Sequence, residues 1–405
     1  MGCAASTPTK EGGSAAPAAK PRAKSAPRKP ELSIGPNYKP VKHLGTGGTG
    51  DTWLFKDVRS GENVAVKFIK RPLPKVLLTN TYREFTIQAE LGTGHANVIK
   101  AYDAVLTPDY LCLVMEAAMG GSLTAYVADK WQEAQAKGTF LSEDEARYVF
   151  KQFLSAVSYC HAHNVAHRDL KLDNTLLDGS TPPVIKICDF GFAKSWSEEA
   201  NMFTQIGTPV YMSPELISND ASKTGYDGRS VDVWASGILL LVMLLGAFPY
   251  DHTDNPDPNT NAAHMEVWLQ QMTKRWNEVP HMREAISKLS VECKDLLNRI
   301  FTVKAEDRIT IEEIKQHPWY LKPLPEPYAS KLESIEKSQE AIDARIRARK
   351  ESAAAVKKRD DRILALITEA TREGKPTDPI KDISLRDEAV LDPVVAAREG
   401  NAADA

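Results

Sequence analysis

The sequence predicts an α+β fold in which a part rich in strands precedes a larger part rich in helices. Strands are indicated at residues 52–55 and 64–67, which are rich in aromatic and β-branched side chains and follow a glycine-rich stretch. A helix is indicated at residues 141–163, where Ser142 and Glu145 form a capping box and apolar residues then recur at helical spacing. A chain of 405 residues is too long for one typical domain, so further segments are expected.

The composition excludes several classes of protein. The formal net charge of −3 gives no reason to expect a polyanionic partner, so nucleic acid is not expected as a ligand. The five cysteines show neither a paired spacing nor a metal-binding spacing, which favours a reduced, cytoplasmic protein. The longest apolar run, residues 237–248, is too short to cross a bilayer and predicts a buried helix.

Residues 1–37 are expected to form a disordered leader, because they are rich in Ala, Pro and Lys and carry almost no large apolar side chains. The first six residues match the myristoylation motif, which predicts an acyl chain on Gly2, and Cys3 beside it is a natural site for palmitate. One acyl chain binds membranes only marginally, so a second chain or a basic patch is needed. The leader offers such a patch in Lys10, Lys20, Arg22, Lys24, Arg28 and Lys29. The chain is therefore expected on the cytoplasmic face of a membrane, unless the glycine at position 2 is a coincidence.

A glycine-rich stretch opens the globular part. It consists of Gly45, Thr46, Gly47, Gly48, Thr49 and Gly50 and has the Gly-x-Gly-x-x-Gly spacing. Glycines let backbone N–H groups close over phosphates, although the same spacing occurs in dinucleotide-binding folds and in ordinary loops. Lys67 follows on a β-branched strand, where a lysine pairs with the α- and β-phosphates of ATP. The order of glycine loop, strand and lysine argues against a merely solvated lysine.

Residues 167–174 and 189–191, which read HRDLKLDN and DFG, contain the polar groups that phosphoryl transfer requires. That reaction needs an acceptor for the hydrogen bond of the substrate hydroxyl and oxygen ligands for Mg²⁺ at the phosphates of ATP. Asp169 fits the first role, and Asn174 and Asp189 fit the second. The alternative is a polar surface loop followed by a buried aromatic residue, and the flanking motifs argue against it.

Together these motifs resemble the eukaryotic protein kinases over residues 38–321. The resemblance implies a bilobal fold with a small β-rich lobe and a large helical lobe. Lys171 and residues 207–211 have the serine/threonine form, and the resemblance implies that Lys171 steadies the transferred phosphoryl group. It also implies that a helix at about residues 77–91 supplies Glu84 as the partner of Lys67. The competing candidate, Glu90, lies too close to the end of that helix.

The hinge between the lobes is expected after a buried strand at residues 111–116. The resemblance implies that backbone groups of Glu116 and Ala118 hold the adenine of ATP. Two departures from the family pattern lie close to this site. Thr52 replaces a valine that packs on adenine, and Ser122 replaces a glutamate that often touches the ribose and a basic residue of the substrate.

The segment from Asp189 to Glu215 is expected to carry the regulation. Thr204 stands four residues before Thr208 and is the predicted phosphosite, for an upstream kinase or for autophosphorylation. Arg168, next to the catalytic aspartate, could pair with that phosphate and order the loop. Ser195 and Ser197 are the second-ranked candidates, and an ordinary loop hydroxyl at position 204 remains the alternative.

Several phrases look like the plant and algal sucrose-non-fermenting-related kinases of the osmotic-stress and abscisic-acid group. They lie at residues 167–178, 185–190, 227–234 and 299–319. Residues 361–370 resemble the regulatory helix of that group, which packs on the small lobe and steadies the helix that carries Glu84. A solvated helix is the alternative. A phosphatase is a possible partner, although the tail lacks the strongly acidic composition of the family's docking segment.

Residues 322–373 are charged and rich in alanine, with apolar residues at three- and four-residue intervals. They predict a long amphipathic helix or a weak coiled coil, which Gln339, Arg349 and Asp360 interrupt. Residues 374–405 are expected to be a mostly disordered tail.

The sequence therefore predicts a kinase that uses ATP and Mg²⁺ to phosphorylate serine or threonine residues of protein substrates, in stress or nutrient signalling. The competing hypothesis is a catalytically silent scaffold with this fold that binds partners through its C-terminal helix. The presence of Lys67, Asp169, Asn174 and Asp189 together argues against a scaffold, which has no need of all four.

Overall fold

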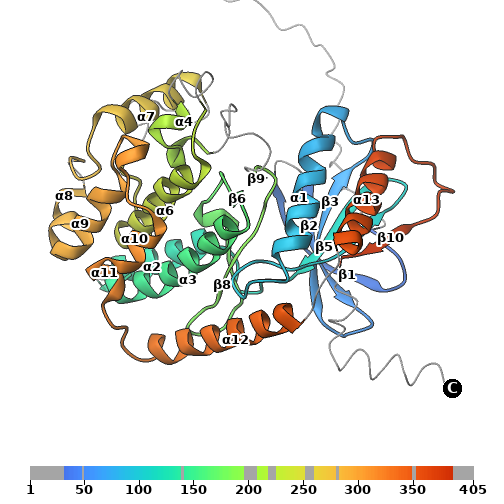
Figure 1. Ribbon diagram of the computed structural model, residues 1–405, viewed down its shortest axis with the longest axis horizontal. Coiled ribbons are helices and arrows are strands. Elements are labelled where there is room, and N and C mark those ends of the chain that lie inside the picture. Colours follow the sequence, from blue (N-terminus) through green and yellow to red (C-terminus); the bar gives the residue numbers. More distant parts are fainter. Residues whose placement is uncertain are drawn as a thin grey trace, which may run out of the picture. The chain divides into compact units, whose positions relative to one another are not determined.

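The computed structural model describes residues 32–47, 50–137, 141–195, 208–217, 225–250, 260–279, 282–348 and 353–385 (Figure 1). The predicted sites at Gly2, Cys3, Gly48, Thr49 and Thr204 lie outside these ranges. An antiparallel sheet forms the small lobe and helices form the large lobe, which confirms the predicted α+β class.

The small lobe is an antiparallel sheet with strand order β1-β2-β3-β5-β4-β10, on which one long helix, α1 (Leu78–Leu91), is packed. The strands are β1 (Tyr38–Gly47), β2 (Gly50–Asp57), β3 (Asn63–Lys70), β4 (Ala101–Leu106), β5 (Tyr110–Glu116) and β10 (Lys381–Ser384). A 3-10 turn, η1 (Lys75–Leu77), leads into α1. Phe85 and Ala89 of α1 pack with Leu111 and Leu113 of β5 in the core of this lobe.

Strand β10 differs from the sequence prediction, which expected a mostly disordered tail after residue 373. It pairs antiparallel with β4, with Ser384 opposite Asp103. Ile383 and Leu385 are buried and lie on one side of the strand, as alternation with a period of two requires. The charged residues around this short pattern concealed it in the sequence.

The large lobe is mainly helical around a large apolar core, and a smaller apolar cluster lies around Met212, Leu216 and Val231. Its helices are α2 (Leu123–Lys137), α3 (Glu143–Ala162), α4 (Pro214–Ile217), α6 (Gly228–Leu245), α7 (Asn261–Thr273), α8 (Arg283–Lys288), α9 (Val291–Ile300), α10 (Ile311–Gln316) and α11 (Pro318–Leu321). Short strands and 3-10 turns lie in the loops between these helices: β6 (Val165–Ala166), β7 (Thr175–Leu177), β8 (Ile185–Ile187), β9 (Lys194–Ser195), η2 (Leu172–Asn174), η3 (Pro209–Tyr211) and η5 (Ala305–Asp307). Ser142 is the N-cap of α3, because its Oγ accepts the N–H of Glu145 at 3.1 Å. Only this half of the predicted capping box is present, since the carboxylate of Glu145 accepts from the hydroxyl of Tyr126 instead of the N-cap backbone.

One helix of the described chain, α6, is long and apolar enough to cross a membrane by length and composition. Its mean hydropathy is 1.6 and 89% of it is buried inside the protein. It contains most of the apolar run predicted as a buried helix, and it forms the centre of the large-lobe core.

The C-terminal extension forms two helices, α12 (Tyr328–Ala348) and α13 (Ala353–Ala370), where the sequence predicted one long helix or a coiled coil. The two helices pack on different lobes. α12 packs against α3, and α13 packs beside α1 of the small lobe (Figure 1). Ile363 and Ile367 of α13 are fully buried in the small-lobe core, so this helix is not a solvated one.

The segment between α1 and β4 is hydrogen-bonded to β8 of the large lobe. Asn97 Nδ2 donates to the carbonyl of Ile185 at 2.9 Å, and the N–H of Ile187 donates to the carbonyl of Asn97 at 2.8 Å. His95 is buried beside them, where its Nδ1 accepts the N–H of Asn97 at 3.0 Å and its Nε2 lies 3.1 Å from Ser155 Oγ. Because Nδ1 accepts, the ring is neutral and the proton is on Nε2.

Stability is predicted to depend on pH through His95. Burial lowers its pKa from about 6.5 to about 4, against a smaller opposing effect of Asp343. Between these values the unfolded chain binds a proton that the folded protein does not bind. The free energy of unfolding should therefore fall by about 2–3 kcal/mol as the pH drops from about 6.5 to 4.

Urea unfolding at pH 7 and pH 5 measures this effect. His95→Gln should be less stable than the parent at pH 7 but should lose less stability at pH 5. His43→Gln, at an exposed position of β1, is the control and should keep the parent's pH dependence. An unchanged pH dependence in His95→Gln would show that other groups cause it.

Candidate active site

A buried lysine, Lys67, stands between two carboxylates. It lies in β3, where the flanking Val66 and Phe68 are buried, and its own side chain is 10% exposed. Glu84 is on the buried face of α1, and Lys67 Nζ donates to its Oε1. Lys67 Nζ also lies 3.8 Å from Oδ1 of Asp189, which follows β8. The structure thus brings together three predicted site residues from distant parts of the chain.

The electrostatics favour the charged forms of Lys67 and Asp189, whereas burial, together with the charge of Asp189, raises the pKa of Glu84 against the opposing effect of Lys67. Burial lowers the pKa of Lys67, but the carboxylates of Glu84 and Asp189 raise it more, so its pKa lies above the usual value. Burial raises the pKa of Asp189, but Lys67 and the N–H of Gly191 lower it more, so its pKa lies below the usual value. The cluster therefore presents a cation suited to phosphate and an anion suited to a metal ion.

Asp169 is the centre of a second group, in the loop after β6. Its Oδ2 accepts from Lys171 Nζ at 2.7 Å and from Asn174 Nδ2 at 3.0 Å. The hydroxyl of Thr208 donates to its Oδ1 at 3.3 Å and accepts from Lys171 Nζ at 3.0 Å. With Nδ2 of Asn174 engaged, Oδ1 of that amide is the atom that could ligate a metal ion.

Asp232 of α6 holds the loop that carries Asp169. It is fully buried and accepts the backbone N–H groups of His167 at 2.9 Å and Arg168 at 2.8 Å, while Nε2 of His161 lies 2.8 Å from it. Arg168 has φ of +63°, a left-handed conformation that costs of order 1–3 kcal/mol for a residue with a side chain. The hydrogen bonds from Asp232 stabilise the loop in this conformation.

The two groups are joined through the backbone. The N–H of Cys188 donates to the carbonyl of Asn174 at 3.0 Å, and Nε2 of His167 lies 3.1 Å from the carbonyl of Cys188. Phe190 is fully buried, with its ring centroid 4.9 Å from that of His167. Asp189 is thus held close to the loop of Asp169.

Glu215 and Arg308 form a bidentate ion pair. Arg308 donates to Oε1 and Oε2 of Glu215 at 2.6 Å and 2.9 Å, and its guanidinium lies 5.0 Å from the centre of the Trp234 ring. Such pairs have fixed geometry, so this one fastens the segment around η3 and α4 to the large lobe.

The glycine-rich strands leave room for a phosphate. A Cβ on Gly50, whose φ is +147°, would overlap the carbonyl oxygen of Phe68, so packing requires glycine there. At Gly45 no described atom lies within 4 Å of the Cβ position, and at Gly47 the closest is the carbonyl oxygen of Gly50 at 3.8 Å. Packing among the described residues therefore does not explain those two glycines. The hydroxyl of Thr46 is engaged, since it donates to Asp51 Oδ1 at 2.5 Å.

Glu116, at the expected hinge, contacts Lys100 of the small lobe and Lys186 of the large lobe. Its N–H donates to the carbonyl of Lys100 at 2.9 Å, so its carbonyl is the group that would meet an adenine. Its carboxylate forms an ion pair with Lys186 Nζ at 2.7 Å. Ala118, the other residue expected to hold adenine, follows β5 in irregular backbone. The sequence analysis missed Lys186, although a lysine inside a buried strand was a signal of such a partner.

The described residues contain no group of three or more His, Cys, Asp or Glu side chains that could hold a metal ion by themselves. Asn174 and Asp189 supply two oxygen ligands, and a nucleotide's phosphates would supply the others. This donor set fits Mg²⁺, which prefers oxygen ligands from one or two carboxylates together with phosphates.

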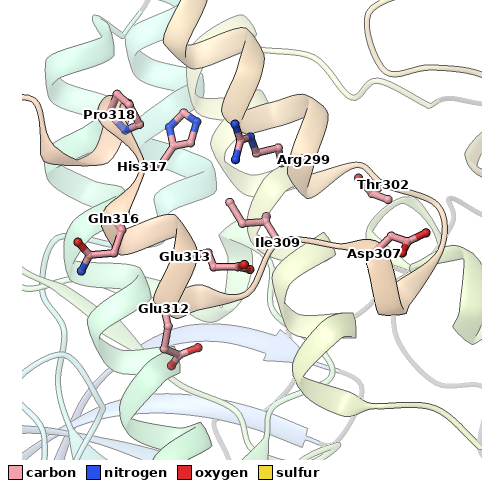
Figure 2. A pocket seen from close by; sticks show the side chains of 9 residues that line it. All are labelled: Arg299, Thr302, Asp307, Ile309, Glu312, Glu313, Gln316, His317 and Pro318. Atoms are coloured by element: carbon pink, nitrogen blue, oxygen red, sulfur yellow. The ribbon is translucent and has the colours of Figure 1, made fainter.

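A separate groove of about 700 Å³ lies on the large lobe around α9, η5 and α10 (Figure 2). Its lining residues are Arg299, Thr302, Asp307, Ile309, Glu312, Glu313, Gln316, His317 and Pro318, and none of them is a predicted site residue. Three of them are carboxylates, which repel phosphate, and Arg299 is already paired with Asp295 at 3.1 Å. This groove therefore does not suit a nucleotide.

Comparison with known proteins agrees with the geometry. Residues 38–320 match the protein kinase domain family. Serine/threonine-protein kinase SAPK2 of Oryza sativa subsp. indica is 42% identical over 288 residues, which are 71% of this chain and 77% of that protein. Serine/threonine-protein kinase SRK2A of Physcomitrium patens is 40% identical over 296 residues, 73% of this chain and 77% of that protein.

Removal of the Asp232 carboxylate is predicted to loosen the loop of Asp169. Asp232→Ala leaves two buried N–H groups without their acceptor, which should lower the free energy of unfolding by about 2–4 kcal/mol. Amide hydrogen exchange at His167 and Arg168 should become faster.

The control is Asp227→Ala, which makes the same chemical change at the exposed N-cap of the same helix. It should cost about 1 kcal/mol and leave exchange at His167 and Arg168 unchanged. Equal effects of the two variants would contradict the role given to Asp232.

Proposed function

The chain belongs to the protein kinase family as a serine/threonine kinase, and we propose the following roles for its residues in the reaction. The observation that carries the proposal is the joint placement of the groups around Lys67 and Asp169. Phosphoryl transfer depends mainly on positioning and on electrostatic stabilisation, and these groups supply both.

Lys67 binds the α- and β-phosphates of ATP, and Glu84 keeps its ammonium group in place. Backbone N–H groups of residues 45–50 cover the phosphates, and backbone groups of Glu116 and Ala118 receive the adenine. Asn174 and Asp189 hold Mg²⁺, which neutralises phosphate charge when bound.

Asp169 accepts the proton of the substrate's serine or threonine hydroxyl. Lys171 lies 2.7 Å from Asp169 Oδ2 and steadies the transferred phosphoryl group. Thr208 bridges these two side chains, which joins the segment before Glu215 to the site of reaction. The proposal thus links substrate binding to the conformation of that segment.

We propose that phosphate on Thr204 switches the enzyme on, placed there by an upstream kinase or by autophosphorylation and removed by a phosphatase. The support is Arg168, whose guanidinium donates to two neutral oxygens, the carbonyl of Phe192 at 2.8 Å and the hydroxyl of Tyr226 at 3.0 Å. A phosphate would offer it a stronger, charged acceptor. The likeness to the osmotic-stress group supports a role in stress or nutrient signalling.

Transfer of phosphate from ATP with Mg²⁺ to a serine/threonine peptide library tests the reaction. Asp189→Ala should lower the rate on the order of a hundredfold or more, because it removes a metal ligand and a preorganised charge. Asp129→Ala, an exposed position on α2, is the control and should keep the parent's rate.

Phosphate mapping on the same samples tests the switch. Active protein should carry phosphate on Thr204, and its occupancy should rise in cells after hyperosmotic shock. No transfer from protein phosphorylated at Thr204 that still binds ATP would support the silent scaffold instead. Activity of Thr204→Ala equal to the parent's would exclude the switch.

We also propose a location on the cytoplasmic face of a membrane, from the motif at Gly2 and Cys3. Co-expression with an N-myristoyltransferase should add the mass of one myristoyl group to the protein and none to Gly2→Ala. Cys3→Ser should keep the myristoyl group and bind anionic vesicles less tightly in palmitoylating cell extract, because one acyl chain gives only marginal binding. An unmodified Gly2 would exclude this location by acylation.

A further inference from the structure

Gln339 of α12 binds the segment that follows α1. Its Oε1 accepts the N–H of Ala96 at 2.8 Å, and its Nε2 donates to the carbonyl of Gly94 at 3.0 Å. Nε2 also lies 2.8 Å from Asp343 Oδ1, one turn further along α12. Both ends of one amide are therefore bonded to backbone groups that lie more than 240 residues earlier in the chain.

The large lobe holds α12 in place. Ile335, Gln339 and Ile342 are at helical spacing on one face, and the two isoleucines are buried. Leu332 packs on the large-lobe core, and the ring of Tyr328 lies 5.1 Å from that of Tyr148 in α3. Gln339 is thus a polar group within an apolar stripe, and its hydrogen bonds to the backbone offset the cost of placing it there.

The segment that Gln339 binds has little room to adjust. A Cβ on Gly92 would stand 2.5 Å from the carbonyl oxygen of Ile99, and one on Gly94 would overlap the hydroxyl of Tyr159. The side chain of Gln88, in the last turn of α1, donates to the carbonyl of Ile99. A shift of this segment therefore moves the end of α1 with it.

The same segment is joined to β8, whose end leads to Asp189. The N–H of Ile99 donates to the carbonyl of Ile187 at 2.9 Å, and Asn97 is bonded to Ile185 and Ile187. Glu84 lies upstream of the segment in α1, and Asp189 lies two residues beyond Ile187. The positions of Glu84 and Asp189, the two partners of Lys67, thus depend on the position of this segment.

We propose that Gln339 is a positioning residue for phosphoryl transfer. By holding Gly94 and Ala96, it sets the end of α1 relative to β8 and so keeps Glu84 and Asp189 at Lys67. This inference rests on the proposed roles of Lys67, Glu84 and Asp189. It concerns α12 and the large lobe, and it is separate from the apolar packing of α13 on α1.

The test uses the full chain with Gln339→Ala and Gln339→Met, which keeps the length of the side chain and removes its hydrogen bonds. Glu340→Ala, exposed on the next position of α12, is the control. Circular dichroism establishes that all variants are folded at the assay temperature, and Thr204 phosphate is brought to equal occupancy. Both Gln339 variants should lower kcat for peptide phosphorylation about tenfold, less than the roughly hundredfold effect of a full 1 Å misplacement. The KM for the peptide should stay within about twofold of the parent's value.

A double-mutant cycle with Glu84→Gln separates positioning from general loss of structure. If Gln339 acts through Glu84, Gln339→Ala should cost little further activity in the Glu84→Gln background. An undiminished loss in that background, or a parent-like kcat in both Gln339 variants, would overturn the inference.

Amide hydrogen exchange gives a readout that does not need activity. Gln339→Ala should speed exchange in the last turn of α1 and at residues 94–99, and Glu340→Ala should not. If the parent protein transfers no phosphate, the proposed function fails, and exchange still decides whether Gln339 holds the segment. Unchanged exchange in Gln339→Ala would overturn the inference.

Discussion

The contact between Lys67 and Glu84 ties the position of α1 to strand β3 of the small lobe. Both groups are largely removed from water, and burial of two charges costs several kcal/mol for each before their attraction repays it. The pair is therefore stable only while α1 stays against β3. Any movement that separates the two side chains leaves a buried charge without its partner, so the position of α1 decides whether the site is assembled.

Three contacts from the C-terminal extension reinforce that position. Ile363 and Ile367 of α13 pack in the same core as Phe85 of α1. Arg71, at the end of β3, donates to the carbonyl of Thr107 at 2.6 Å and to the carbonyls of Glu369 and Arg372 at 3.2 Å each. Glu369 lies in the last turn of α13 and Arg372 just beyond it, where a cation is favoured by the helix dipole. Gln339 adds the third contact, from a helix held by the other lobe.

The sequence predicted those contacts of the site that join residues at a short, fixed spacing in the chain. Asp169, Lys171 and Asn174 lie within six residues of one another, so the sequence motif alone predicted that they are close in space. The pairing of Lys67 with Glu84 required a choice between Glu84 and Glu90, and the structure places Glu84 on the buried face of α1 and Glu90 at an exposed position.

What the sequence could not predict depends on partners far apart in the chain. Gln339 interrupts an apolar repeat, so the sequence analysis interpreted it as a break in a coiled coil. The structure shows it bonded to backbone groups of the segment between α1 and β4. Strand β10 has four residues, too few for a clear alternating pattern, and its partner β4 begins 280 residues earlier. Lys186 similarly pairs with a hinge residue that no local pattern connects to it.

Strand β10 also affects how the protein can be made. Strand β4 gains its outer partner in the sheet only after residue 384 has been synthesised. The small lobe therefore completes its sheet late, although most of its residues are translated first. Until then β4 presents an open edge of backbone groups, the kind of surface on which chains pair with one another and aggregate. A chain shortened before Lys381 keeps every catalytic residue and still carries that open edge, so its yield and solubility, rather than its chemistry, would reveal the loss.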